Sequence, residues 1–280
     1  MRTSASFNLL ILLTSILLLI SGCQQSPDIV IDESSLPRVA ALIAVNGNQT
    51  VKLGWPRASS AVELQLHRSM DADFIATNKT LLATLPATAT HYTDTALTNG
   101  TTYYYRIVPV MEINGGLRRL GISEGTTPGR PQDYSAIDHI SFSEHIQPIF
   151  TSGCAVNGCH TGADDEHTTV AGLAKATHEG EFSLKSWEDL FKCGEHGAVI
   201  IPYKSAKSHL LFHLNLDTTF APVSLPHMPP VGGVNIPLNQ LQALKQWIDA
   251  GAPNDVGAVA FTSNQLGKVR SEEHTTELQS

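Results

Sequence analysis

The chain has 280 residues, of which 42% are hydrophobic and 16% charged, and its formal net charge at pH 7 is −8. This length is sufficient for two ordinary domains, and the apolar content excludes a largely disordered chain. The acidic balance also excludes a nucleic-acid-binding surface, which needs clustered lysine and arginine.

The N-terminus has the sequence pattern of an export signal. Arg2 precedes the apolar run Phe7 to Ile20, which is shorter than the roughly 20 residues that span a bilayer and is typical of a secretory signal peptide. The following ISGC, which ends at Cys23, resembles the bacterial lipobox. That resemblance implies cleavage before Cys23, lipidation of its side chain and a membrane anchor. Gln24, in place of aspartate, implies the outer membrane. An ordinary signal peptide with an incidental cysteine is the alternative.

A polar tether at 23–36 leads into a region that is rich in short strands. Between Arg38 and Thr127 the predicted strands are VAALIAV, TVKLGW, AVELQLHRS, TYYYRIVPVMEI and LRRLGIS. NGG, from Asn114 to Gly116, predicts a hairpin turn between the last two. The spacing indicates a seven-stranded β-sandwich.

Three residues in this region give it a resemblance to fibronectin type III domains. Trp55 ends the second strand, where that family has its core tryptophan. In TDTALTNGTTYYYRIVPV, Leu97 corresponds to the corner leucine and Tyr103 to the corner tyrosine. Alternation along the strand places Tyr103 and Tyr105 on one face and Tyr104 on the other, which favours core packing over a sugar-binding platform. The domain is expected to be a spacer, or to dock a protein or polysaccharide.

PGRPQD, from Pro128 to Asp133, marks a domain boundary, after which the hydrophobic period becomes helical. Ser141 with Glu144 forms a capping-box pattern for a first helix, in which Pro148 predicts a kink or a late start. In NQLQALKQWIDAGAP, Asn239 is expected to cap a last helix, and Gly251 to end it.

The stretch GCAVNGCH contains Cys154, Cys159 and His160 within eight residues. In an exported protein two nearby thiols can form a disulfide, a metal site or thioether bonds to haem. A histidine directly after the second cysteine is the signature of covalent haem attachment in CxxCH. Here the spacing is CxxxxCH, with a loop that is two residues longer.

A candidate for the second axial ligand is Met228 in HMPP, followed by two prolines that stiffen the chain. The region from Ile140 to Pro253 resembles class I-like cytochrome c domains, especially lipoprotein and planctomycete-type branches. It has their opening helix, their cysteine pair with CH, a stretch like GAVIIPYKSAKSHLLFHL, MPP and a helix ending WIDAGAP, in that order.

The cytochrome resemblance implies a ligand set for one covalent haem c. Cys154 and Cys159 would form the thioethers, and His160 and Met228 would be the axial ligands of the haem iron. With both axial positions filled, catalysis at the iron is disfavoured, so we expect an electron carrier without catalytic residues.

Other histidines and the fourth cysteine have weaker interpretations. His227 could replace Met228 as ligand, and His167 or His178 are more remote alternatives. His209 and His213 have the i,i+4 spacing of a metal-binding pair without an evident third ligand. Cys193 has no obvious partner.

The acidic charge is concentrated in the second half of the chain. Residues 138–265 have thirteen acidic and six basic side chains, whereas 38–128 have six acidic and eight basic. A redox partner protein would therefore present a basic patch.

The expected fold is multidomain, an N-terminal all-β fibronectin-like sandwich plus a C-terminal mainly α cytochrome c domain. The expected segments are a lipoprotein signal peptide (1–22), a tether (23–36), a fibronectin type III-like domain (37–128), a linker (129–138), a cytochrome c-like haem domain (139–256) and a tail (270–280) that resembles translated sequencing-adapter read-through. The function expected is electron transfer in the cell envelope, on the periplasmic or surface side of the membrane. The alternatives are an extracellular binding or adhesion lipoprotein with a structural C-terminal domain, and the electron-delivery subunit of a separate oxidoreductase.

Overall fold

The computed structural model describes most of the chain between residues 36 and 260. The described ranges are 36–113, 116–123, 125–156, 159–160, 183–191, 199–216, 222–230 and 233–260. The predicted signal peptide, Cys23, nearly all of the tether and the tail at 270–280 lie outside them, as do Cys193, His167 and His178. Among the described residues, no helix is long and apolar enough to cross a membrane.

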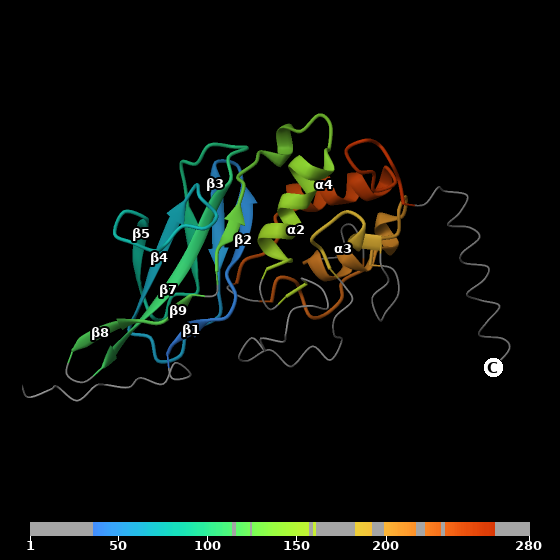
Figure 1. Cartoon of the computed structure of the whole chain (residues 1–280). Helices are drawn as coiled ribbons and strands as arrows, with labels where there is room; N and C mark the ends of the chain where they lie inside the picture. Colours follow the sequence, from blue (N-terminus) through green and yellow to red (C-terminus); the bar gives the residue numbers. More distant parts are fainter. Residues whose placement is uncertain are drawn as a thin grey trace, which may run out of the picture. The chain divides into compact units, whose positions relative to one another are not determined.

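The first half of the described chain forms β-strands. Their bounds are β1 Arg38–Val39, β2 Ile43–Gly47, β3 Thr50–Gly54, β4 Glu63–Ser69, β5 Leu81–Pro86, β6 His91–Asp94, β7 Tyr103–Ile113, β8 Leu117–Leu120, β9 Ile122–Ser123 and β10 Thr127–Gly129. One sheet has the order β2-β3-β6, and the other has the order β10-β7-β4-β5 with β8 also paired to β7. All pairs in these two sheets are antiparallel, as Figure 1 shows for the long neighbours β4 and β7.

The two sheets enclose a common hydrophobic core, here called the sandwich core. It includes Leu42, Ala44, Val51, Leu53, Trp55, Leu64, Leu66, Leu97, Tyr105 and Ile107. Because these residues come from strands of both sheets, the sheets pack face to face, as the strand pattern predicted.

The three marker residues of the sandwich lie where the sequence predicted. Trp55 is fully buried and its Nε1–H donates to the Ala89 carbonyl oxygen at 2.8 Å. Leu97 is buried in the sandwich core. The Tyr103 hydroxyl accepts a hydrogen bond from the Thr98 N–H at 3.2 Å, which is the geometry of a tyrosine corner.

The last predicted strand, LRRLGIS, is interrupted at Gly121 and forms β8 and β9 instead of one strand. The Gly121 N–H donates to the Pro109 carbonyl oxygen, and a Cβ at this position would collide with the Pro37 carbonyl oxygen. Only glycine allows this close approach. Beyond Gly121, β9 pairs in parallel with β1. The first predicted strand is likewise divided, into β1 and β2.

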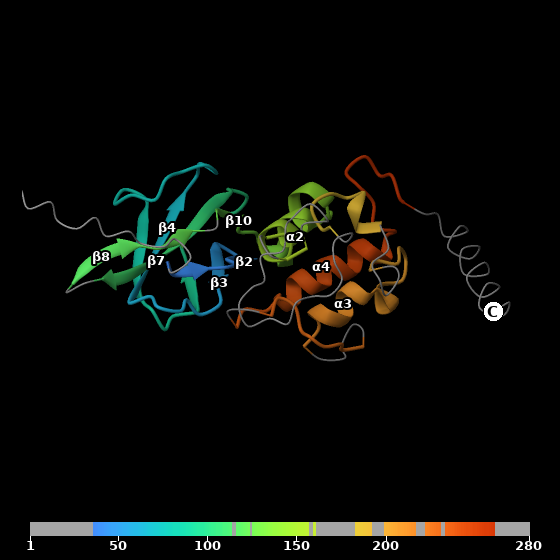
Figure 2. The same cartoon turned by 60° about the horizontal axis from the view of Figure 1, so that its bottom comes forward.

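The second half of the described chain is built from short helical segments. Their bounds are η2 Tyr134–Ala136, the π-helical η3 Phe142–Ile146, α2 Gln147–Gly153, η4 Asp189–Phe191, η5 Ser205–Lys207, α3 His209–Leu214 and α4 Leu238–Asp249. In Figure 2, α3 lies alongside α4.

The helix ends follow the predicted signals in part. Ser141 caps η3 by accepting the Glu144 N–H, and α2 begins late, with Pro148 in its first turn, as expected. For α4 the prediction of Asn239 as the cap is wrong. The N-cap residue is Pro237, whose backbone is extended and which directly precedes the first helical residue, Leu238. Asn239 lies inside the helix, and its side chain accepts the Gln240 N–H. Gly251, with φ +101°, follows α4 as predicted.

The helical segments share a second core, here called the helical core. It includes Phe142, Ile146, Ile149, Phe150, Cys154, Val156, Leu211, Leu214, Leu244, Trp247 and Ile248, together with Ile43 and Val45 of β2. The rings of Phe142 and Trp247 stack in it, with centroids 5.6 Å apart. Strand β2 therefore contributes to both cores.

Candidate functional site

Helix α2 positions the first cysteine of the CxxxxCH sequence. Cys154 is the C-cap residue of α2, and its N–H donates to the Phe150 carbonyl oxygen at 2.8 Å. The same carbonyl accepts the Ala155 N–H at 2.7 Å, which turns the chain at the helix end. Ile149 and Phe150 are buried, and this fixes the rotation of α2 so that Cys154 is 8% exposed in the helical core.

The loop after Cys154 closes on itself through two backbone hydrogen bonds. The Cys159 N–H donates to the Val156 carbonyl oxygen at 3.0 Å, and the His160 N–H donates to the Cys154 carbonyl oxygen at 3.0 Å. The second bond brings His160 back to the first cysteine although four residues separate the two cysteines. Both cysteines are free thiols in this structure.

Burial keeps the three side chains of this loop in their neutral forms. It raises the pKa of Cys154 to about 12, with a smaller contribution from Cys159, and it also raises the pKa of Cys159. Burial lowers the pKa of His160, and the nearby His213 lowers it further. A neutral imidazole has the lone pair that a metal ligand needs.

The segment containing Met228 is attached to α3. The Met228 N–H donates to the His213 carbonyl oxygen at 2.9 Å, and the Ser224 N–H donates to the Phe212 carbonyl oxygen at 2.8 Å. Nδ1 of His213 lies 2.9 Å from the Pro226 carbonyl oxygen. These contacts hold residues 224–228 against the last turn of α3, and Met228 packs against the helical core.

His213 contacts the Met228 segment through its backbone. Its carbonyl oxygen accepts the Met228 N–H, and its proximity, in addition to burial, lowers the pKa of His160. Cys154 belongs to the helical core, and Cys159 and Met228 are partly buried residues that pack against it. Two thiols, an imidazole and a thioether in apolar surroundings fit a covalently attached porphyrin, whose ring is apolar and whose iron accepts nitrogen and sulfur ligands.

Two histidines next to Met228 are further possible ligands. Nδ1 of His227 is buried and has no hydrogen-bond partner among the described residues. His213 presents one ring nitrogen to a backbone carbonyl, an arrangement typical of metal-ligating histidines. From the sequence, His213 was only half of an i,i+4 pair, and its contacts with Pro226 and Met228 were not predicted.

The other candidate residues do not join this group. His209 is exposed and its ring lies 5.0 Å from that of Phe212, which gives it a packing contact. In the part of the chain that the structure describes, no group of three or more His, Cys, Asp or Glu residues could hold a metal ion.

Tyr103 and Tyr105, in the tyrosine run of β7, pack inside the sandwich. Tyr105 is fully buried, and its hydroxyl donates to Asp94 Oδ2 at 2.8 Å. Tyr103 packs against the same core, and the Arg68 guanidinium lies 5.5 Å from its ring centroid. The predicted alternation of these residues is confirmed.

Among known proteins, only solved structures resemble part of this chain, and some of them are fibronectin type III-like. No protein-family model and no curated protein matches the chain. A solved Fn3-like protein from Clostridium thermocellum is 26% identical, with 38% of this chain and 97% of that chain covered and a TM-score of 0.28. The fn3 domain of human collagen alpha-1(XX) is 15% identical, with coverages of 35% and 86% and a TM-score of 0.26. Pectate lyase PelI from Erwinia chrysanthemi is 19% identical, with coverages of 31% and 26% and a TM-score of 0.23.

The structural neighbours thus include fibronectin type III-like domains. The strand order, the buried Trp55 and the corner hydrogen bond of Tyr103 define a fibronectin-like domain in the first half of the chain.

Proposed function

We propose that the chain is a lipid-anchored monohaem c-type cytochrome that transfers electrons in the cell envelope. The observation that supports the proposal is the closed CxxxxCH loop, in which the His160 N–H bonds to the Cys154 carbonyl oxygen. A disulfide alone would not require a histidine at this position.

Each residue has a defined task in this proposal. The S–H groups of Cys154 and Cys159 would each add across one vinyl group of the haem, the sulfur and the hydrogen going to its two carbons, so that no oxidant is consumed. His160 and Met228 would be the axial ligands. A bound haem would supply one-electron redox chemistry, and the apolar residues around Cys154 would limit the access of water to it.

The ligand pair predicts the direction of the redox properties. A thioether is a soft ligand that stabilises ferrous iron, so histidine with methionine favours a relatively high midpoint potential. Two filled axial positions favour electron transfer over catalysis. The partners would be redox proteins with a basic docking patch, because residues 138–265 have thirteen acidic and six basic side chains.

The anchor would place the protein in the periplasmic space or at the outer membrane. Cys23, after the apolar run, would carry the lipid. An extracellular binding or adhesion lipoprotein and an electron-delivery subunit of a separate oxidoreductase are the alternatives. A measurement of haem content distinguishes them in part: the adhesion lipoprotein would contain no haem, whereas the electron carrier and the electron-delivery subunit would.

The first test is covalent haem in the full chain. The isolated protein should retain haem through denaturing electrophoresis and should gain one haem mass per chain. Cys159→Ala should greatly reduce the holoprotein, whereas Cys193→Ser, the matched control, should leave it unchanged. Haem that acid acetone extracts intact, or a bare chain with an internal disulfide, would contradict the proposal.

The second test identifies the distal ligand. Met228→Ala should open the iron so that added carbon monoxide binds readily, and it should remove the weak near-infrared sulfur-to-iron band of the oxidised protein. His213→Ala, His227→Ala and the exposed Met70→Ala should leave both properties unchanged. If a histidine variant opens the iron and Met228→Ala does not, that histidine is the ligand. Fast binding of carbon monoxide by the unaltered protein would contradict the simple electron carrier.

A further inference from the structure

Strand β2 of the fibronectin-like domain is packed on both faces. Leu42, just before the strand, and Ala44 belong to the sandwich core, whereas Ile43 and Val45 belong to the helical core with Cys154 and Phe150. Successive residues of a strand point to opposite faces. One face of β2 therefore packs in the same core as Cys154, the first residue of the CxxxxCH loop, which is here called the attachment loop (154–160).

Asn46 connects the end of β2 to helix α2. Its side chain is 1% exposed, and its Nδ2 donates to the Pro148 carbonyl oxygen at 3.3 Å and to Ser152 Oγ at 3.1 Å. Its Oδ1 accepts the Arg130 N–H at 2.8 Å. The Asn46 carbonyl accepts a hydrogen bond from the Gln240 side chain of α4. Buried hydrogen bonds of this kind fix the position of α2, because breaking them leaves polar groups without partners.

The C-terminal end of α2 lies close to the same strand. A Cβ on the buried Gly153 would lie 3.4 Å from the Ala44 carbonyl oxygen. Gly153 directly precedes Cys154, so the backbone contact lies one residue from the first attachment cysteine.

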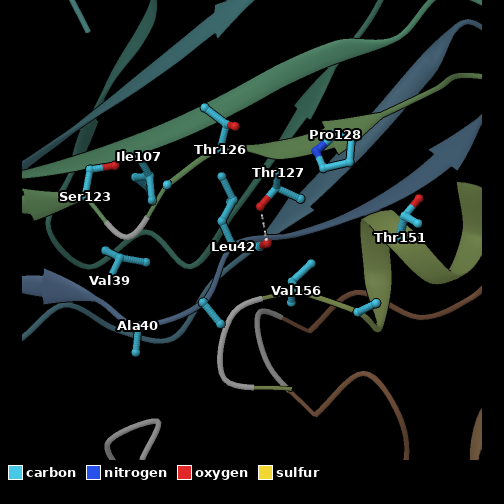
Figure 3. Close-up of a pocket in the computed structure, with 13 residues that line it drawn as sticks. Val39, Ala40, Leu42, Ile107, Ser123, Thr126, Thr127, Pro128, Thr151 and Val156 are labelled. Carbon is cyan, nitrogen blue, oxygen red and sulfur yellow. Dashed lines mark hydrogen bonds between the residues drawn. The ribbon is translucent and has the colours of Figure 1, made fainter. Parts of the chain in front are cut away.

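The loop itself also reaches the sandwich. Ala155 and Val156 line a pocket of about 100 Å³ together with residues of the sandwich, including Leu42, Ile107 and Thr127. Figure 3 shows Leu42, Ile107, Thr127 and Val156 around the pocket, with the hydrogen bond from the Thr127 hydroxyl to the Leu42 carbonyl oxygen, which is 2.7 Å long. Val156 is 7% exposed and belongs to the helical core.

We infer that the fibronectin-like domain is the support that positions the attachment loop. The first two residues after Cys154, Ala155 and Val156, line the pocket with the sandwich. Asn46 is then a positioning residue that acts on Cys154 through α2. The part of this inference that concerns haem rests on the function proposed above.

The test uses Asn46→Ala and Val156→Ala in the full chain, with Asn48→Ala as the matched control. Asn48 lies on the same hairpin, but it is exposed and its side chain bonds to Asp133 and Asn99. Two readouts are measured in each variant. One is hydrogen exchange at the amides of Cys154 and Ala155, and the other is the share of haem that is bound through both cysteines, determined by mass spectrometry of the haem peptide.

In Asn46→Ala the two amides should exchange about tenfold faster, because the loss of the two side-chain hydrogen bonds to α2, among the three that Asn46 makes, shifts local opening by about that factor. Attachment through Cys154 should fall while attachment through Cys159 remains. Val156→Ala should also lower attachment through Cys154, although it removes no hydrogen bond. This second variant keeps the inference testable if Asn46→Ala does not fold correctly. Asn48→Ala should change neither readout, and amides of the β4–β7 ladder should be unchanged in all three variants.

Two results would overturn the inference. One is exchange and attachment in Asn46→Ala that equal those of Asn48→Ala. The other is faster exchange with full attachment through Cys154 in both Asn46→Ala and Val156→Ala. If the unaltered protein carries no haem, the proposed function fails, and hydrogen exchange alone decides whether the sandwich supports the loop.

Discussion

Replacing Tyr105 by phenylalanine should destabilise the fold by about 2 kcal/mol, since a hydrogen bond to a charged group contributes about 1.5–3 kcal/mol. Tyr105 is fully buried and its hydroxyl donates to Asp94 Oδ2 at 2.8 Å. Asp94 is also buried and still accepts from Nη1 of Arg68, at 3.0 Å to Oδ1 and 2.8 Å to Oδ2. The substitution therefore removes one bond from a carboxylate that remains paired, and it leaves a gap of only one oxygen atom.

Tyr103→Phe provides the matched comparison. It removes the same hydroxyl from the same strand, but this hydroxyl accepts from a neutral backbone N–H at 3.2 Å and is only partly buried. We expect the free energy of unfolding to fall by about 0.5–1.5 kcal/mol. Urea unfolding of the full chain, followed by tryptophan fluorescence, measures both as midpoint shifts at constant slope. A loss for Tyr105→Phe that is no larger than that for Tyr103→Phe would refute the assignment of the buried bond.

Three further predictions concern the anchor, acid stability and the helical core. Cys23→Ser should abolish acyl labelling and release the protein from membranes; unchanged labelling and fractionation would exclude the lipid anchor. The hydrogen bond from the Ser141 hydroxyl lowers the pKa of Asp255, so its stabilising contribution should be complete above the ordinary aspartate pKa of about 3.9 and be lost as the pH falls through the lowered value. Asp255→Asn should therefore flatten the acid side of the stability–pH curve, and an identical curve would contradict this. Leu244→Ala, at 0% exposure, should cost about 2–5 kcal/mol, against less than about 0.5 kcal/mol for Leu238→Ala at 57% exposure on the same helix; equal losses in thermal unfolding would mean that α4 does not pack as described.

Local sequence signals were sufficient for much of the sandwich. The alternation of Tyr103 and Tyr105 predicted which ring enters the core, because the side-chain period of a strand is fixed at two. The corner positions of Leu97 and Tyr103 were assigned from the resemblance to fibronectin type III domains, and the Tyr103 hydrogen bond agrees with it. The break at Gly121 could not, since it depends on the approach of Pro37, which lies far away in the sequence.

The local closure of the CxxxxCH loop follows from residues that are close in sequence, whereas its surroundings could not be predicted. Cys154, Cys159 and His160 are close in sequence, and the turn at the end of α2 keeps them together. The position of His213 depends on how residues 224–228 fold back on α3, which no local pattern specifies. The role of Asn46 could not be predicted, because its partners on α2 lie about a hundred residues away in the sequence.

The double-sided burial of β2 makes this fibronectin-like domain difficult to exchange for another. A substitute sandwich with polar residues in place of Ile43 and Val45 would expose polar groups to the core around Phe150, and burying such groups without partners is costly. It would also need an amide side chain in the place of Asn46 to bond to α2. In related chains, changes at Ile43 or Val45 should therefore be accompanied by compensating changes in the helices, so that the two halves evolve as one unit.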